Sequence, residues 1–391
     1  MKNWKYKRLS ECSNFISERT SNITIDNYIS TENMIENRGG VKIASTLPDV
    51  KSTSAYKPND ILLSNIRPYF CKIWFADKKG SCSNDVLVVR AKKEIDPKFL
   101  YYVLSDQNFF NWDSITSKGT KMPRGTPNAI MKYSVPDIPL RTQQKIASIL
   151  SAYDNLIQNY KKQIEALQTA ASELYKEWFV RFRFPGYQIT NFENGIPEGW
   201  KVYLIKDLCY INKKTVSSKD AKKEILYLDT GSITENVIDS FESYILEEAP
   251  SRARRIVKKN SIIFSTVRPN QNHYGILKTV PENLIVSTGF AVFDPKFDIA
   301  NILYFFLSSK DFVDYCQMIA EGAVATYPSI KPEEIGKVKI LLPTMDLAIK
   351  LNHSFESLFL RIENLKQQIT NLTQQRDLLL PRLMSGKLEV E

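Results

Sequence analysis

The side chains that most often carry nucleophilic or metal chemistry are few in this 391-residue sequence and widely scattered. The only histidines are His273 and His353, and the five cysteines form no Cys-x-x-Cys pair, standing at positions 12, 71, 82, 209 and 316. A histidine-rich metal site is therefore excluded, and a His-based catalytic triad is not expected. We predict small buried thiols in place of a disulfide framework.

Sequence patterns that bind nucleotide cofactors are absent as well. No two of the 14 glycines have the Gly-x-Gly spacing, and no Gly-x-x-x-x-Gly-Lys-Ser/Thr loop occurs, which argues against dinucleotide, adenosyl-cofactor and phosphate-binding loops. The carboxylates Asp77, Asp85, Asp106 and Asp113 show no spacing typical of a general acid and base. A nuclease-like Asp…Glu-x-Lys cluster stays open, but Glu224, Glu333 and Glu334 fit a solvated surface better. We interpret the chain as a binding protein without catalytic residues, metal or cofactor of its own.

The charge of the chain indicates what it binds. It carries 53 Lys and Arg against 43 Asp and Glu, a net charge of +10, and residues 1–195 hold most of the excess, with 28 against 19. Such a balance favours a polyanionic partner, nucleic acid first, although a merely basic protein is the alternative. Mean hydropathy is −0.28, and neither an 18-residue apolar run nor a signal peptide is visible, so we expect a cytoplasmic protein.

An internal duplication organises the elements that position these charges. Residues 57–68 (KPNDILLSNIRP) match residues 258–269 (KKNSIIFSTVRP) at an offset of 201. Further matches lie in the same order, with offsets from 196 to 204: Trp4 with Trp200, Gly119 with Gly322, Pro127 with Pro328, and Pro139 with Pro343. Loop insertions would produce this drift, so the sequence predicts a tandem repeat.

Each repeat begins with a mixed α/β region. Short β-type runs are bounded by Pro, Gly, Asn and Asp, and they lie at 61–63, 86–89, 262–264 and 291–293. Helical patterns rich in Tyr, Phe and Leu follow at 97–110 and 299–312. We expect these aromatic side chains in the core and not on a base-stacking surface.

A long helix closes each repeat, with apolar residues at alternating spacings of four and three. This is the signature of a coiled coil, although two amphipathic helices, each lying on its own domain, are the alternative. Pro185-Gly186 should end the first helix, and Pro381 should break or kink the second near Leu380, so Leu383 is left out of the seam. The predicted seam is Ile146, Leu150, Tyr153, Ile157, Tyr160, Ile164, Leu167, Ala171, Leu174, Trp178, Leu351, Phe355, Leu358, Ile362, Leu365, Ile369, Leu372 and Leu379.

The predicted fold is therefore α+β, with two similar domains and two long helices. We place the first domain at 1–142, the first helix at 143–184, the second domain at 185–344 with a linker at 185–199, and the second helix with its tail at 345–391. A pseudo-two-fold relation would make the helices an antiparallel coiled coil. Two similar basic surfaces could then read two half-sites on duplex DNA.

The sequence resembles the specificity subunit of type I restriction–modification systems along essentially its whole length. The most specific segments are IPLRTQQKIASIL at 138–150, SELYKEWFVRF at 172–182 with FPG behind it, IPEGW at 196–200 and LPRLMSGKL at 380–388. The second helix departs from the family pattern, because its lead-in, LPTMDLA at 342–348, lacks the Gln-Gln of the first. The two lead-ins are thus not expected to make identical partner contacts.

The resemblance implies two target-recognition domains, each reading one half of a bipartite DNA sequence, joined by an antiparallel coiled coil. It also implies that the chain is not an enzyme by itself. The expected partners are double-stranded DNA, two methyltransferase subunits and the restriction subunits, to which S-adenosylmethionine, ATP and Mg²⁺ would belong. No membrane partner is expected. The alternatives are a self-sufficient DNA enzyme and a coiled-coil scaffold that binds proteins only.

Candidate DNA-contacting residues are long, basic or amide-bearing side chains on loops. Arg67 and Arg268 share one position in the repeat and suit phosphate contact, or else a structural ion pair. The carboxylate-free segment 117–126 is the best candidate loop, and the dense basic cluster at 252–259 is either a phosphate contact or a solvated face. The full set is Asn65, Arg67, Lys118, Thr120, Lys121, Arg124, Arg254, Arg255, Thr266, Arg268, Thr326 and Tyr327.

Overall fold

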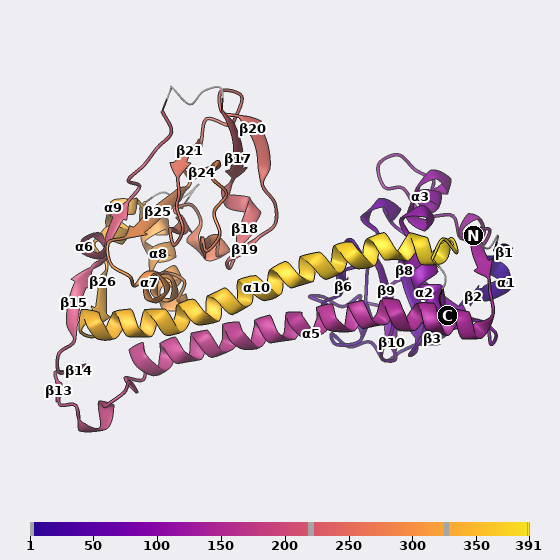
Figure 1. Cartoon of the computed structure of the whole chain (residues 1–391), viewed down its shortest axis with the longest axis horizontal. Coiled ribbons are helices and arrows are strands. Elements are labelled where there is room, and N and C mark those ends of the chain that lie inside the picture. Colours follow the sequence, from indigo (N-terminus) through magenta and orange to yellow (C-terminus); the bar gives the residue numbers. More distant parts are fainter. Residues whose placement is uncertain (1–3, 218–222, 324–327, 389, 391) are drawn as a thin grey trace. The chain divides into compact units, whose positions relative to one another are not determined.

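The computed structural model describes residues 4–217, 223–323, 328–388 and 390 (Figure 1). The chain divides into two compact units: unit 1 is Met1–Tyr160 with Gln368–Glu391, and unit 2 is Lys161–Gln367. Both long helices are shared between the units. Helix α5 (Leu140–Phe179) begins in unit 1 and ends in unit 2, whereas α10 (Met345–Met384) begins in unit 2 and ends in unit 1. Each unit therefore contains one segment of each long helix.

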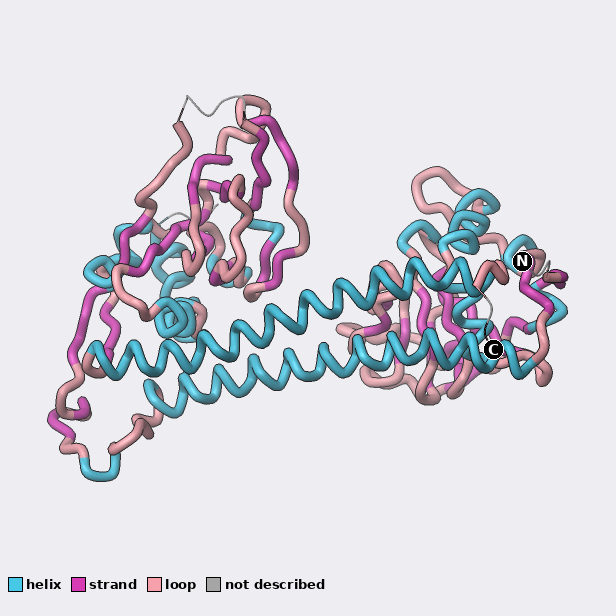
Figure 2. Tube along the Cα trace, viewed as in Figure 1, coloured by secondary structure: helices cyan, strands magenta, loops and turns pink. Residues whose placement is uncertain are grey.

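Unit 1 combines short strands with short helices (Figure 2). Its first sheet has the order β2 (Ser13–Phe15), β11 (Val86–Ala91), β8 (Ile61–Ser64) and β9 (Ile73–Phe75). Its second has the order β3 (Arg19–Thr20), β7 (Thr53–Tyr56), β10 (Gly80–Cys82) and β4 (Tyr28–Ile29). Two strand pairs complete it, β1 (Lys5–Arg8) with β12 (Ser134–Asp137) and β5 (Met34–Ile35) with β6 (Gly40–Val41). Its short helices are α1 (Leu9–Cys12), α2 (Pro97–Ser105), α3 (Gln107–Thr116), α4 (Pro127–Ile130) and the 3₁₀ turn η1 (Pro68–Phe70).

Unit 2 repeats this arrangement. Its first sheet has the order β16 (Cys209–Ile211), β25 (Phe290–Pro295), β22 (Ile262–Ser265) and β23 (Tyr274–Ile276). Its second has the order β20 (Glu242–Ile245), β17 (Glu224–Leu228), β24 (Leu284–Ser287) and β21 (Ala253–Ile256). The strand pairs are β15 (Lys201–Leu204) with β26 (Lys339–Leu342), β18 (Ile233–Thr234) with β19 (Val237–Ile238), and β13 (Phe192–Glu193) with β14 (Ile196–Pro197). Its short helices are α6 (Ile205–Leu208), α7 (Ala300–Leu307), α8 (Lys310–Ala323), α9 (Pro332–Gly336) and the 3₁₀ turns η2 (Tyr187–Ile189), η4 (Thr230–Ser232) and η5 (Pro269–Gln271).

The strand pairing confirms the duplication and the predicted fold class. Strand β8 lies between β11 and β9, just as β22 lies between β25 and β23. In the second sheets, β10 pairs parallel with β4 and antiparallel with β7, and β24 pairs in the same two ways with β17 and β21. One predicted match was wrong. The Arg67 and Arg268 N–H groups donate to the carbonyls of Pro123 and Pro328, so Pro328 corresponds to Pro123 and not to Pro127.

The duplicated strand holds two apolar layers together, because successive side chains of a strand face opposite sides. Ile61 and Leu63 of β8 belong to the core under the helices of unit 1, whereas Leu62 belongs to the core between its sheets. In unit 2, Ile262 and Ile263 divide between two cores in the same way. The predicted strand runs are therefore real and buried on both faces. All five cysteines are buried free thiols, as expected.

The predicted helix at 97–110 is interrupted. Asp106 has extended backbone angles (φ −67°, ψ 143°), and its carboxylate accepts the N–H of Asn108. This contact caps α3, which therefore begins directly after α2 ends. Such a capping contact competes with helix continuation. Phe99, Phe109 and Phe110 are fully buried, which confirms that this aromatic stretch belongs mainly to the core. The stretch at 299–312 is likewise divided between α7 and α8.

The long helices bury the predicted seam inside each unit. None of the 18 seam residues is exposed. In unit 1, Ile146 and Leu150 of α5 share a core with Leu380 and Leu383 of α10. In unit 2, Ala171 and Trp178 share a core with Leu351 and Phe355. The two ends of the seam thus join both long helices to the globular core of each unit.

Of the break or kink expected at Pro381, the break does not occur. Helix α10 continues through this proline to Met384, and Leu383 is fully buried. Pro381 is itself exposed, while Leu380, Leu383 and Met384 of the same turn are held in the core of unit 1. Tertiary packing therefore outweighs the backbone hydrogen bond that proline cannot donate. Among the described residues, no helix is long and apolar enough to cross a membrane.

The glutamine of the first lead-in has a structural role. The Gln143 side chain is buried, accepts the N–H of Asp96 at 2.9 Å and donates to the Ile138 carbonyl at 2.9 Å. It therefore holds the start of α5 against the start of α2. In unit 2, Asn352 does the corresponding work, since its Oδ1 accepts the N–H of Asn301 at 2.9 Å. The missing glutamine of the second lead-in is thus replaced one turn later.

Candidate nucleic-acid interface

The best candidate loop, residues 117–126, folds back onto the segment that follows β8. Lys118 and Arg124 exchange two backbone hydrogen bonds of 2.9 Å, which close the loop. The Arg67 N–H donates to the Pro123 carbonyl at 2.8 Å, and the Gly125 N–H donates to the Asn65 carbonyl at 3.0 Å. Two regions predicted separately from the sequence therefore form one surface of unit 1.

The side chains of this loop present cations to solvent. Lys118, Thr120, Lys121 and Arg124 are all exposed. The Arg124 Nη2 lies 3.2 Å from the Asp85 Oδ1, but its side chain stays 56% exposed, so the pair holds the guanidinium loosely. Exposed cations on a loop can contact phosphates without a large desolvation cost.

Arg67 has an unusual backbone conformation and no side-chain ion pair among the described residues. Its φ is 51°, in the left-handed region, and its guanidinium lies 5.9 Å from the centre of the Phe70 ring. The side chain is half-buried, and its Nε is buried without a hydrogen-bond partner. Within the described part of the chain no carboxylate pairs with Arg67, which favours a ligand contact over a structural ion pair.

The corresponding segment of unit 2 has the same backbone and different side chains. Arg268 has a φ of 46°, is exposed, and donates its N–H to the Pro328 carbonyl at 2.9 Å. Thr266 is buried, and both its N–H and its hydroxyl donate to the Gly289 carbonyl at 2.9 Å. The hydroxyl of Thr266 is therefore engaged within the fold. Thr326 and Tyr327 lie outside the described residues.

The basic cluster of unit 2 lies on and beside β21. Its two central arginines lie at a β-bulge, because Ala253 pairs with Ser287 and Arg255 pairs with Val286. Arg254 is exposed, whereas Arg255 is half-buried with its Nε buried and unpartnered, and burial lowers the pKa of Arg255. The turn at 287–289 connects this cluster to Thr266, since Thr288 donates its N–H to the Arg252 carbonyl. Of these two arginines, Arg254 is the one that is open to an anionic ligand.

One residue to which sequence reasoning assigned no role, Asp113, lies beneath loop 117–126, where Gly125 of the loop contacts it. Asp113 of α3 is fully buried, and neither carboxylate oxygen has a hydrogen-bond partner. Burial raises the pKa of Asp113 to about 7. Gly125 lies directly against this carboxyl, with no room for a side chain. The signal in the sequence was the duplication itself, since unit 2 has Cys316 and Ile330 at the matching positions.

Comparison with known proteins places the chain in a family. A family model described as the type I restriction modification DNA specificity domain matches residues 1–169 and 197–375. The chain belongs to this family. Its two matches correspond to the two repeats, so the specificity domain occurs twice.

The alignments with related specificity subunits cover most of the chain. The MjaIX type I restriction enzyme specificity subunit of Methanocaldococcus jannaschii is 26% identical over 77% of this chain and 71% of its own length. The MjaVIII specificity subunit of the same organism is 25% identical over 99% and 93%. The crystal structure of a type I restriction–modification S subunit from M. genitalium has a TM-score of 0.59 at 17% identity, covering 100% and 97% of the two chains. The last of these supports the fold.

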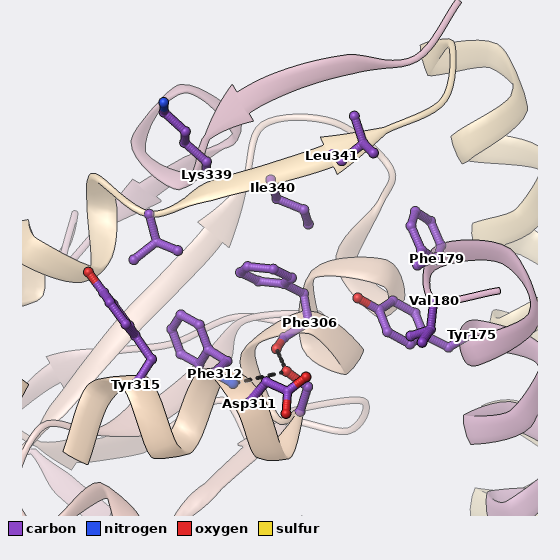
Figure 3. A pocket seen from close by; sticks show the side chains of 12 residues that line it. Tyr175, Phe179, Val180, Phe306, Asp311, Phe312, Tyr315, Lys339, Ile340 and Leu341 are labelled. Atoms are coloured by element: carbon purple, nitrogen blue, oxygen red, sulfur yellow. Dashed lines mark hydrogen bonds between the residues drawn. The ribbon is translucent and has the colours of Figure 1, made fainter. Parts of the chain in front are cut away.

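Both specificity domains have a hollow at the same place. In unit 2 a cavity of about 440 Å³ lies between the end of α5, helices α7 and α8, and strand β26 (Figure 3). In unit 1 a cavity of about 220 Å³ lies between the end of α10, helices α2 and α3, and strand β12. The linings correspond through the duplication: Phe179, Val180, Phe306, Ser309, Asp311, Val338, Lys339 and Leu341 in unit 2, and Met384, Ser385, Val103, Asp106, Asn108, Tyr133, Ser134 and Pro136 in unit 1. The hollows are therefore equivalent in position and different in chemistry.

Proposed function

We propose that this chain is the specificity subunit of a type I restriction–modification complex and reads a bipartite target in duplex DNA. Unit 1 reads one half through loop 117–126 and Arg67, and unit 2 reads the other through Arg268 and the basic residues beside β21. One observation carries this proposal. The same left-handed arginine, held by the same backbone hydrogen bond, occurs once in each specificity domain.

The side chains available suit a division of labour at the DNA. Lys118, Lys121 and Arg124 are exposed and flexible, which suits phosphate contacts that position the domain. Arg67 has a planar guanidinium near the foot of the loop, and such a group can donate two hydrogen bonds to the edge of a guanine. Base reading would thus fall to Arg67 and its neighbours, and affinity to the lysines.

In this proposal, partner subunits carry out the catalytic steps. Two methyltransferase subunits would bring S-adenosylmethionine, and restriction subunits would bring ATP and Mg²⁺. The duplicated hollow supports two copies of one partner, because each specificity domain offers a hollow at the same place, formed by its short helices and one long helix. We therefore propose these hollows as part of the methyltransferase docking surface.

The test is co-expression with the neighbouring methyltransferase subunit in a host without DNA methylation. Single-molecule sequencing of the host DNA should then find modified adenine in a bipartite motif, only when both chains are present. A stable complex that leaves the DNA unmodified would contradict the proposal. Methyl transfer from labelled S-adenosylmethionine by the isolated chain would favour a self-sufficient enzyme, and absence of any DNA binding would favour a protein-only scaffold.

A further inference from the structure

Loop 117–126 rests on a buried acid. A Cβ atom on Gly125 would lie 2.5 Å from the Asp113 Oδ1 and 2.8 Å from the Asn65 Oδ1, so both oxygens reach the same side of this glycine. The Asn65 Oδ1 and both Asp113 oxygens are buried without hydrogen-bond partners. We call these three residues, Asn65, Asp113 and Gly125, the acid–amide seat.

The seat joins three elements that surround the DNA-reading surface proposed above. Asp113 belongs to α3, Asn65 follows β8 directly, and Gly125 ends the exposed part of loop 117–126. The backbone already fixes Gly125 to Asn65, through its N–H bond to the Asn65 carbonyl. A change in the seat must therefore be transmitted to the cations of the loop, since Arg124 is the residue directly before Gly125.

Unit 2 shows that the fold does not need a carboxyl at this place. The matching residues are Thr266, Cys316 and Ile330, and the Ile330 N–H donates to the Thr266 carbonyl at 2.9 Å as Gly125 does to Asn65. Cys316 is 0% exposed and Ile330 is 3% exposed, and both lie in one apolar core. Burying a carboxyl without hydrogen bonds is costly, so unit 1 carries an expense of stability that its sister domain avoids.

The protonation state of Asp113 decides what the seat can do. A neutral carboxyl beside Gly125 has a hydrogen to donate to an acceptor such as the Asn65 amide oxygen, whereas a carboxylate there can only accept, as that oxygen does. Burial is the cause of the raised pKa, with no contribution from a charged neighbour. The titratable and charged groups on the surrounding elements are Arg38 against Phe110, Arg67 before η1, Asp106 at the start of α3, and Lys118 and the Arg124–Asp85 pair on the loop.

We propose that Asp113 is a positioning residue for DNA reading by unit 1, whose neutral carboxyl, paired with the Asn65 amide, holds loop 117–126 in its DNA-reading conformation. This inference rests on the proposed function. Protonated Asp113 holds the loop in this conformation. The DNA-reading conformation is therefore fully populated at low pH and is lost as pH rises through the pKa of Asp113 near 7. Ionisation also places a negative charge beneath a phosphate-binding loop, which works in the same direction.

The test uses the full chain in complex with its methyltransferase subunit and a duplex that carries the methylated motif. Affinity is measured between pH 6 and pH 8.5 for the wild type and for Asp113→Asn, an amide that mimics the neutral acid in size. We expect wild-type affinity to fall by up to about tenfold per pH unit above 7, and D113N to bind with a flat profile. The exposed Asp77→Asn is the matched control, because it removes one carboxylate from the same unit and should keep the wild-type profile.

A second variant covers the case in which D113N is poorly folded. Asp113→Cys introduces the residue of unit 2, so its thermal unfolding should match or exceed that of the wild type. Its discrimination should weaken for base changes in the half-site of unit 1 and persist for those in the half-site of unit 2. A pH-dependent D113N, or a D113C with unchanged discrimination, would overturn the inference alone. A wild-type complex that binds no DNA at any pH would overturn the proposed function with it.

Discussion

A half-buried ion pair of unit 1 occupies positions that are apolar in unit 2. In unit 1 the Arg376 Nη1 lies 2.7 Å from the Asp154 Oδ1, and the Tyr102 hydroxyl donates to the Asp154 Oδ2 at 2.6 Å. Burial alone would lower the pKa of Arg376, but Asp154 and Asp377 outweigh it and raise that pKa. The matching positions of unit 2 are Ala171 and Phe359, which lie together in an apolar core. The ion pair is therefore one of two solutions to the same packing problem.

We predict that Asp154→Ala lowers the free energy of unfolding by about 3 kcal/mol, because it leaves the Arg376 guanidinium partly buried beside an empty site. The double change Asp154→Leu with Arg376→Met should cost less than Asp154→Ala alone, since it copies the apolar solution of unit 2. Urea unfolding followed by circular dichroism measures both. Glu165→Ala on the exposed face of α5 is the control. A double variant less stable than D154A would contradict the argument.

We predict that Lys121 contacts a phosphate of the DNA. It is exposed on loop 117–126, and a phosphate contact there adds affinity that depends on salt and not on sequence. Lys121→Ala should weaken binding to target and non-target duplexes alike, and should lower the slope of log affinity against log salt by about 1. Lys93→Ala, an exposed lysine beyond the far end of β11, should leave the slope unchanged. Equal slopes for wild type and K121A would remove Lys121 from the interface.

At the scale of elements, the hollow of each specificity domain predicts a stoichiometry. Val180 is 66% exposed at the rim of the hollow in unit 2, and Ser385 occupies the matching position in unit 1. A carboxylate introduced at either rim would be desolvated by a docked partner. Val180→Glu and Ser385→Glu should therefore each reduce the bound methyltransferase from two copies to one, and the double variant should bind none.

Native mass spectrometry counts the copies directly. Val237→Glu, at a comparably exposed apolar residue of β19, is the matched control and should retain two copies. Two copies bound to the double variant would show that the hollows play no part in docking, while leaving the DNA-reading proposal intact.

Much of the element order follows from sequence alone, and its failures have identifiable causes. The strands at 61–63 and 262–264 are predictable because one apolar run is repeated between the same turn residues. Periodicity cannot show that Asp106 turns its carboxylate back to cap a new helix. Nor can it show that the core of unit 1 holds Leu380 and Leu383 on both sides of Pro381. In both cases a contact with a specific partner overrides a local preference.

One part of the candidate site can be predicted from the sequence, and another part cannot. Exposed cations on loop 117–126 are visible in the sequence, because charge and flexible residues are local properties. The acid–amide seat is not, since Asp113 meets Asn65 and Gly125 only in the folded domain. Comparing the repeats could have found it, but the offset between them drifts from 201 at Asn65 to 205 at Gly125. The match of Gly125 to Ile330 becomes clear only from their shared backbone hydrogen bonds.

At the scale of the whole molecule, the division of each long helix between the units defines what can be exchanged. Replacing residues 1–142 with those of a relative that reads another sequence should change one half of the methylated motif and leave the other half intact. Unit 1, however, also contains residues 143–160 and 368–391. Gln143 bonds to Asp96 and Ile138, and Leu383 is fully buried in the same core. When only residues 1–142 are replaced, the foreign domain therefore has to pack against the native segments of α5 and α10 that belong to unit 1.

We accordingly predict that a graft of 1–160 together with 368–391 unfolds at a higher temperature than a graft of 1–142. Both grafts should produce the same altered half of the motif, because the reading loops lie before residue 142 in each. The difference in unfolding temperature should vanish when the donor keeps glutamine at 143 and apolar residues at 146, 150 and 383, since those side chains then meet equivalent partners. Single-molecule sequencing reads the motif and scanning calorimetry the stability. A graft of 1–142 that changes both halves of the motif would refute the assignment of one half-site to each unit.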